Sequence, residues 1–210
     1  MFVCEYSLTF ISVKKMKKDL SKRQNEIIHI SLKLIAEKGI QGLTIKNLAN
    51  EIGVVESAIY RHFKNKFEIL NTILETIREN SVTDNFDKNV NTLEQLAEGW
   101  ENHFKIFASF PALVSVIFSE DLFQNETSLL NKTKEIMQKS IKDLTSIIKH
   151  GQKKDEIRSD IKAEYLALML IGSIRMFVKQ WKMSDYSYDL RKRGNILINS
   201  LKQLLKPIDE

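Results

Sequence analysis

The feature that most constrains this chain is the stretch from Thr44 to Phe63, which holds two short apolar patterns of helical spacing around Gly53. The first repeats at i, i+3, i+4 and i+7, as one face of a helix does, and consists of Ile45, Leu48, Ala49 and Ile52. Thr44 precedes this face as a hydroxyl cap, and Gly53 follows it as the left-handed residue that ends a helix. The second consists of Ala58, Ile59 and Phe63. The free-energy cost of helix nucleation exceeds the stabilisation that a few turns provide, so helices this short must pack on neighbours. The stretch therefore predicts a helix-turn-helix.

Capping patterns predict a supporting helix on each side of this pair. Ser21-x-x-Gln24 is a capping box that opens a helix to about Lys38. Asn65-x-x-Glu68 is a similar arrangement, and it opens a second helix with a buried apolar stripe.

The rest of the chain is also helical in pattern, and it contains no strand candidate. Gly151 is expected to end the third of five further helices, and Asp160 to cap the fourth. The five are Thr92 to about Phe110, Pro111 to about Phe118, Glu126 to His150, Ile161 to about Trp181 and Tyr188 to about Leu205. The sequence therefore predicts an all-α fold of about nine helices.

Three segments within residues 23 to 70 resemble the DNA-binding domain of the TetR family of bacterial transcriptional regulators. They are AEKG at Ala36–Gly39, LTIKNLANEIGV at Leu43–Val54 and IYRHFKNKFEIL at Ile59–Leu70. The resemblance implies a helix-turn-helix DNA-binding domain at residues 21–66. It also implies a ligand-binding and dimerisation domain at residues 67–210.

The chain departs from the family pattern at Val55. The family usually has Ser or Thr there, as the cap of the second short helix. Valine cannot accept that hydrogen bond, at a typical cost of ~1 kcal/mol. Any phosphate contact that the hydroxyl makes in the family is therefore in doubt here, whereas the fold is not.

The charge of the chain is concentrated near its amino end. Residues 14 to 66 hold twelve Lys and Arg against five Asp and Glu, a net charge of +7, so the other residues carry −2 of the overall +5. A basic segment on a near-neutral body fits phosphate binding by one domain, although a solvated basic face is the plain alternative.

Other features argue against several classes of protein. The single Cys4 excludes an internal disulfide, which is compatible with a cytoplasmic location. No stretch of the chain reaches about 18 uninterrupted apolar residues, so no membrane span is expected. The four histidines are scattered without paired spacing, and neither a phosphate-binding glycine loop nor a nucleophile elbow is present. We therefore expect no metal, no cofactor and no enzymatic activity.

Residues 1–20 allow two interpretations. The opening carries Glu5 and has no basic residue before its apolar part, so it makes a poor signal peptide. Translation that truly begins at Met16 is one account, and a short extension that packs on the protein is the other.

The resemblance and the chemistry of DNA together indicate two sets of contact residues. Hydroxyls, amines and helix N-termini bind phosphates, which indicates Thr44, Tyr60, His62 and Lys66. Base edges are expected to be read by Glu56, Ser57 and Ala58, with Lys46 and Arg61 from the flanks. The alternative for Glu56 is that its charge only stabilises the helix N-terminus.

A homodimer is expected, because one head reads only half of a palindromic operator. The last two helices are the predicted interface, in a four-helix bundle with their symmetry mates. The first would offer Ala163, Ala167, Leu170, Gly172 and Ile174, and the second Ile196, Leu197, Leu201 and Leu204. The alternative is that these faces belong to the internal core.

Aromatic and methionine residues crowd the middle of the body and predict a small-molecule pocket, although each one alone is more simply a core residue. His103 and Arg175 are the candidate polar groups, for a hydrophobic or acyl-like effector. The other candidates are Trp100, Phe104, Phe107, Phe118, Phe123, Met137, Tyr165, Met169 and Met176.

The sequence thus predicts a homodimeric repressor that binds a palindromic operator and is released by a small hydrophobic effector. Two rivals remain. One is a DNA-binding protein of the same fold without an effector, which would act structurally or through a protein partner, and a filled core between the fifth and eighth helices would favour it. The other is a helical enzyme or interaction protein whose basic end is coincidental.

Overall fold

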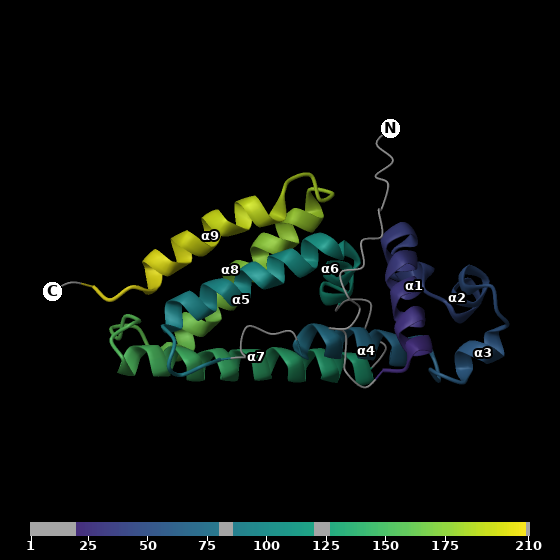
Figure 1. The fold of residues 1–210 in the computed structure, drawn as a ribbon, viewed down its shortest axis with the longest axis horizontal. Helices are drawn as coiled ribbons and strands as arrows, with labels where there is room; N and C mark the ends of the chain where they lie inside the picture. Colours follow the sequence, from purple (N-terminus) through teal and green to yellow (C-terminus); the bar gives the residue numbers. More distant parts are fainter. Residues whose placement is uncertain (1–19, 80–85, 120–126, 209–210) are drawn as a thin grey trace.

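The computed structural model describes residues 20–79, 86–119 and 127–208. Within these ranges the chain forms nine α-helices and one 3-10 turn without any strand, which confirms the all-α fold (Figure 1). None of these helices combines the length and apolarity that crossing a bilayer requires. The question of the start at Met16 and the candidate Phe123 both lie outside the described residues. The elements are α1 (Lys22–Lys38), η2 (Ile40–Gly42), α2 (Ile45–Ile52), α3 (Glu56–Tyr60), α4 (Lys66–Glu79), α5 (Thr92–Ser109), α6 (Pro111–Ile117), α7 (Thr127–Lys153), α8 (Ala163–Met183) and α9 (Leu190–Leu205).

The molecule is elongated, with α1, α2 and α3 forming a head at one end and the long helices α5, α7, α8 and α9 forming a body (Figure 1). In the body α9 packs along α5, and α7 packs along α8. The head meets the body where α1 contacts α6 and α4. Helix α4 belongs to both parts, because it starts beside the head and then packs against α6 and α7.

Local hydrogen bonds build the head as the sequence predicts. The Ser21 hydroxyl accepts from the Gln24 N–H at 3.2 Å, and the Gln24 side chain accepts from the Ser21 N–H at 3.0 Å, which completes the capping box. The Thr44 hydroxyl accepts from the Asn47 N–H at 3.1 Å and starts α2. Gly53 ends α2 in the left-handed conformation, at φ 77°. The turn between α2 and α3 is therefore fixed by the residues that predicted it.

The start of α4 differs slightly from a capping box. The Asn65 side chain accepts from the Glu68 N–H at 3.0 Å, as expected. The Glu68 carboxylate reaches back one residue further and accepts from the Lys64 N–H at 2.5 Å. The two bonds together hold the segment between α3 and α4.

The prediction that Gly151 ends α7 is wrong, because the helix continues to Lys153. Gly151 is buried where the segment after α7 and the start of α5 come close to the helix. A Cβ at this position would lie 2.8 Å from Ile157 Cδ1 and 3.0 Å from Thr92 Cγ2. The glycine is thus needed for close packing rather than for stopping the helix.

The starts of the last two helices also differ from the prediction. Helix α8 begins at Ala163 after Lys162, which makes no side-chain cap bond. Asp160 instead pairs with Arg158, at 2.7 Å between carboxylate and guanidinium. Helix α9 begins at Leu190, where the Asp189 carboxylate accepts from the N–H groups of residues 191 and 192. Asp160 therefore pairs with Arg158 instead of capping α8, and Asp189 caps α9.

Most of the small residues predicted to face a partner subunit from α8 are in the internal core. Ala163, Ala167, Leu170 and Ile174 are buried in the single chain, and of the predicted α8 set only Gly172 is exposed. On α9, Leu201 is buried, whereas Ile196 and Leu204 are exposed and Leu197 is half-buried. The prediction was wrong for the buried residues, because helices of the same chain pack there, α7 along α8 and α5 along α9.

Candidate DNA-reading helix and body cavity

Helix α3 is anchored by one side and exposed on the other. Ile59 is buried against the head core, and Ala58 is half-buried. Glu56, Ser57 and Arg61 are exposed, and Tyr60 keeps 51% of its surface exposed. Four of the candidate DNA contacts on or beside α3 therefore lie on a surface that a DNA groove could reach.

The remaining candidate contacts lie around α3. Thr44 and Lys46 are at the start of α2, His62 follows α3, and Lys66 is the first residue of α4. The Thr44 oxygen accepts the cap bond, which leaves its O–H hydrogen to donate to a further acceptor such as a phosphate. Free N–H groups and the helix dipole favour anions at the starts of α2 and α4. Thr44, Lys46 and Lys66 therefore lie where a helix start favours a phosphate.

An ion pair joins the helix-turn-helix to α1. The Lys33 ammonium lies 2.5 Å from the Glu51 carboxylate of α2. This hydrogen bond raises the pKa of Lys33 and lowers the pKa of Glu51. The pair is exposed, so it orients α2 more than it stabilises the fold.

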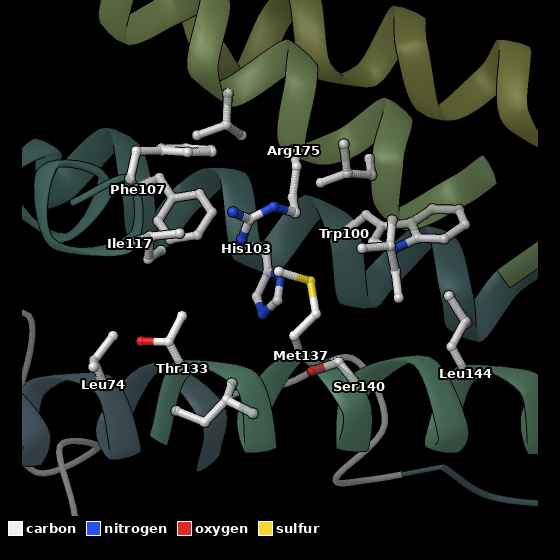
Figure 2. A pocket seen from close by; sticks show the side chains of 15 residues that line it. Leu74, Trp100, His103, Phe107, Ile117, Thr133, Met137, Ser140, Leu144 and Arg175 are labelled. Atoms are coloured by element: carbon white, nitrogen blue, oxygen red, sulfur yellow. The ribbon is translucent and has the colours of Figure 1, made fainter. Parts of the chain in front are cut away.

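A cavity of about 190 Å³ lies inside the body, between α4, α5, α6, α7 and α8. Figure 2 shows it from close by, with Arg175 and His103 on one side and Thr133, Met137 and Ser140 on the other. The full lining is Leu74, Trp100, His103, Phe107, Ile117, Phe118, Thr133, Ile136, Met137, Ser140, Leu144, Ile171, Ile174, Arg175 and Val178. The wall is mainly apolar, with a few polar side chains among the aromatic and aliphatic ones.

Two polar side chains of the cavity, Arg175 and His103, lie against aromatic neighbours. The guanidinium carbon of Arg175 lies 4.9 Å from the centre of the Phe118 ring, a cation–π arrangement. The His103 and Phe107 rings have centres 5.7 Å apart. A ligand with an apolar chain and an anionic or carbonyl end suits such a wall. Among the described residues no group of three or more His, Cys, Asp or Glu could hold a metal ion.

Of the ten predicted pocket residues that the structure describes, six line the cavity and four do not. Phe104 is a core residue that packs on Phe177, with ring centres 5.6 Å apart, and on Gly194. Tyr165 and Met169 lie on the outer face of α8, with 58% and 54% of their surfaces exposed, and Met176 is also exposed there. Their placement in the pocket was wrong, because α8 is apolar around most of its circumference and the sequence does not tell which side faces inward.

Three residues of the cavity wall on α7, Thr133, Ser140 and Leu144, were not predicted from the sequence. With the predicted Met137 they follow one another at spacings of four, three and four, and all four line the cavity. This is helical periodicity with two hydroxyls in the stripe. The hydroxyls on the apolar face of α7 were the available signal for Thr133 and Ser140.

Two family models match the chain. "Bacterial regulatory proteins, tetR family" matches residues 27–73, and "YsiA-like protein, C-terminal region" matches residues 63–205. Together they cover the head, α4 and the body.

Curated and solved relatives extend along most of the chain. The fatty acid metabolism regulator protein of Bacillus subtilis is 26% identical over 84% of this chain and 92% of its own. The probable acrEF/envCD operon repressor of Escherichia coli K12 is 22% identical over 92% of this chain and 91% of its own.

A solved structure agrees with both. The transcriptional regulator FadR from Bacillus subtilis, in complex with stearoyl-CoA, superposes with a TM-score of 0.70 at 26% identity, over 88% of this chain and 100% of its own. These relatives are transcriptional regulators and not enzymes. The chain belongs to the tetR family of bacterial regulatory proteins and is a DNA-binding transcriptional regulator.

Proposed function

We propose that this protein is a homodimeric repressor that leaves its operator when a hydrophobic, acyl-bearing effector occupies the body cavity. One observation carries the proposal: α4 holds candidate residues of both sites. Its first residue, Lys66, is a candidate phosphate contact, and Leu74 further along the same helix lines the cavity. A ligand that displaces α4 therefore also displaces the head.

The wall of the cavity supports the class of effector. Its surface is mainly apolar, and Arg175 and His103 offer donors to the polar end of a ligand. A Bacillus subtilis relative was solved with stearoyl-CoA, which supports a fatty acyl thioester as the ligand here. The cavity of about 190 Å³ is smaller than the ~300–1,000 Å³ of common ligand sites. A long acyl chain would thus have to push the surrounding helices apart, and this is the movement that α4 would transmit.

The same cavity weighs against the rival without an effector, because a filled core was the feature that would have favoured it.

The DNA contacts are proposed as the sequence indicated. Thr44, Tyr60, His62 and Lys66 would bind phosphates, and Lys46, Glu56, Ser57, Ala58 and Arg61 would reach base edges. Two recognition helices must lie about 34 Å apart to enter successive major grooves, so a change in their spacing releases the operator.

The exposed faces of the last two helices are the proposed dimer interface. Apolar side chains stand in solvent there: Tyr165, Leu168, Met169 and Met176 on α8, and Ile196 and Leu204 on α9. Gly172 lies among the α8 residues, with open space where a side chain would project. An apolar surface of this extent fits a contact with a second copy, which would give a four-helix bundle. This face keeps Gly172, Ile196 and Leu204 of the interface predicted from the sequence and omits the residues that are buried in the single chain.

The test is operator binding with and without acyl ligands. Fragments of the source genome are selected on the protein, and fluorescence anisotropy then gives the Kd for one operator in a series of acyl-CoA thioesters from four to eighteen carbons. We expect salt to weaken binding steeply and one range of chain lengths to raise the Kd at least tenfold. If every acyl ligand leaves the Kd unchanged, the effector proposal is wrong.

A cavity-filling variant separates ligand binding from DNA binding. Ser140→Leu would fill part of the cavity, so operator affinity should persist while the response to acyl-CoA is lost. The matched control is Ser146→Leu, which places the same side chain on an exposed position of α7. Equal behaviour of the two variants would contradict the assignment of the site.

A further inference from the structure

Val55 is an apolar side chain exposed at the tip of the recognition helix. It keeps 70% of its surface exposed, and among the described residues of the head only Tyr60 is another large apolar side chain that is exposed. The adjacent Val54 is half-buried and packs against the head core. No hydrogen bond from the Val55 side chain caps α3. Valine at this position thus supplies no cap for α3 and exposes its isopropyl group to water, and neither feature stabilises the free protein.

The backbone holds Val55 in one place. The Val54 N–H donates to the Ala49 carbonyl and the Ala58 N–H donates to the Val55 carbonyl, both at 2.9 Å. The residue is extended, with φ −78° and ψ 152°, a region that β-branched residues favour. Branching at Cβ also restricts χ1, so little side-chain freedom remains to be lost in a contact. The isopropyl group is therefore presented rigidly.

The neighbours of Val55 identify the surface that would cover it. Glu56 and Ser57 follow it in the exposed first turn of α3, and such first turns contact base edges in the major groove. The apolar group that base edges offer in that groove is the C5-methyl of thymine. Contact with a methyl group would remove the isopropyl group from water and so favour binding, whereas contact with a charged or hydroxyl group would give no such gain.

We infer that Val55 contacts the C5-methyl of a thymine in each half-site and so helps to determine operator specificity. The inference rests on the proposed binding of an operator by the helix-turn-helix. It adds an apolar reader to the polar candidates Glu56, Ser57 and Arg61, at the position where this chain departs from the family pattern.

Replacement of thymine by deoxyuridine tests the inference, because it removes only the methyl group. Each thymine of the selected operator is replaced in both half-sites in turn, and the Kd is measured for the wild type and for Val55→Ala. For the wild type, one replacement should weaken binding about fourfold per half-site, the value of one buried methyl. For Val55→Ala, the same replacement should change the Kd by less than twofold.

Two further variants control for stability and for the chemical change. Val90→Ala makes the same truncation at an exposed position between α4 and α5, and it should keep the wild-type thymine profile. Val55→Thr keeps the branched shape and supplies the missing cap, so its melting temperature should rise while part of the methyl effect remains.

The outcomes separate this inference from the proposal beneath it. If selection on the wild-type protein yields no fragment that it binds, the proposal of operator binding itself is wrong. A protein that binds its operator, but whose deoxyuridine profile is the same with Val55 and with Ala at that position, overturns only the methyl contact.

Discussion

At the scale of single residues, Glu156 shows how a local network sets the response to acid. Its partial burial alone would raise the pKa, but hydrogen bonds from Lys154 and from the Thr92 N–H lower it to about 2. The bond lengths are 2.8 Å to the ammonium and 2.7 Å to the amide nitrogen. This carboxylate links the start of α5 to the segment after α7, next to the close packing at Gly151.

The lowered pKa of Glu156 predicts a loss of stability in acid. A carboxyl whose folded pKa is depressed contributes stability above its unfolded pKa, and the contribution is lost as pH falls from about 4.5 toward 2. Glu156→Gln should therefore be destabilised by about 3 kcal/mol at neutral pH, and the difference from the wild type should shrink through this window. Urea unfolding at several pH values measures it, and a difference that stays constant with pH would refute the assignment.

At the scale of elements, an ion pair ties α4 to α7 beside the cavity. The Lys132 ammonium lies 2.8 Å from the Glu75 carboxylate. Leu74 and Thr133, the sequence neighbours of the pair, both line the cavity. The ion pair thus spans the two helices that an effector would have to separate, and it opposes their separation.

Weakening this pair should make the repressor easier to release. We expect Glu75→Gln to lower the acyl-CoA concentration for half release of the operator two- to fivefold, since a partly exposed pair contributes about 0.5–1 kcal/mol. The control is Asp143→Asn, which breaks the Lys139–Asp143 pair of 2.6 Å within α7. Anisotropy titrations compare the two variants. A Glu75→Gln curve that coincides with the control curve would show that the pair does not couple the helices.

At the scale of the whole molecule, the proposed function requires two copies, because the fold carries one candidate recognition helix at one end of an elongated chain (Figure 1). The apolar side chains that stay exposed are concentrated on the outer faces of α8 and α9. A twofold contact there would hide them and would leave the two heads free to reach one DNA duplex.

A charge in that interface should separate the subunits. Met169→Lys would bury one unpaired ammonium from each subunit in the dimer, at a cost of at least about 3 kcal/mol or a hundredfold in the dimer Kd. Sedimentation velocity measures the oligomeric state, and operator affinity should fall with it. Val90→Lys makes an exposed apolar residue charged outside the interface and should remain dimeric. A dimer that withstands Met169→Lys as well as the control would exclude this face.

The sequence by itself determined the head, because short-range interactions decide it. Ser21, Thr44 and Gly53 act within four residues of their own positions, and the structure shows each in its predicted role. The number and order of the helices likewise follow from apolar periodicity, which is local. Only the tertiary structure decided which face of α8 is inside, why Gly151 stands within α7 and where the cavity lies. Helix α8 carries apolar residues on both faces, so either face could have been buried, and the packing of α7 on one of them made the choice.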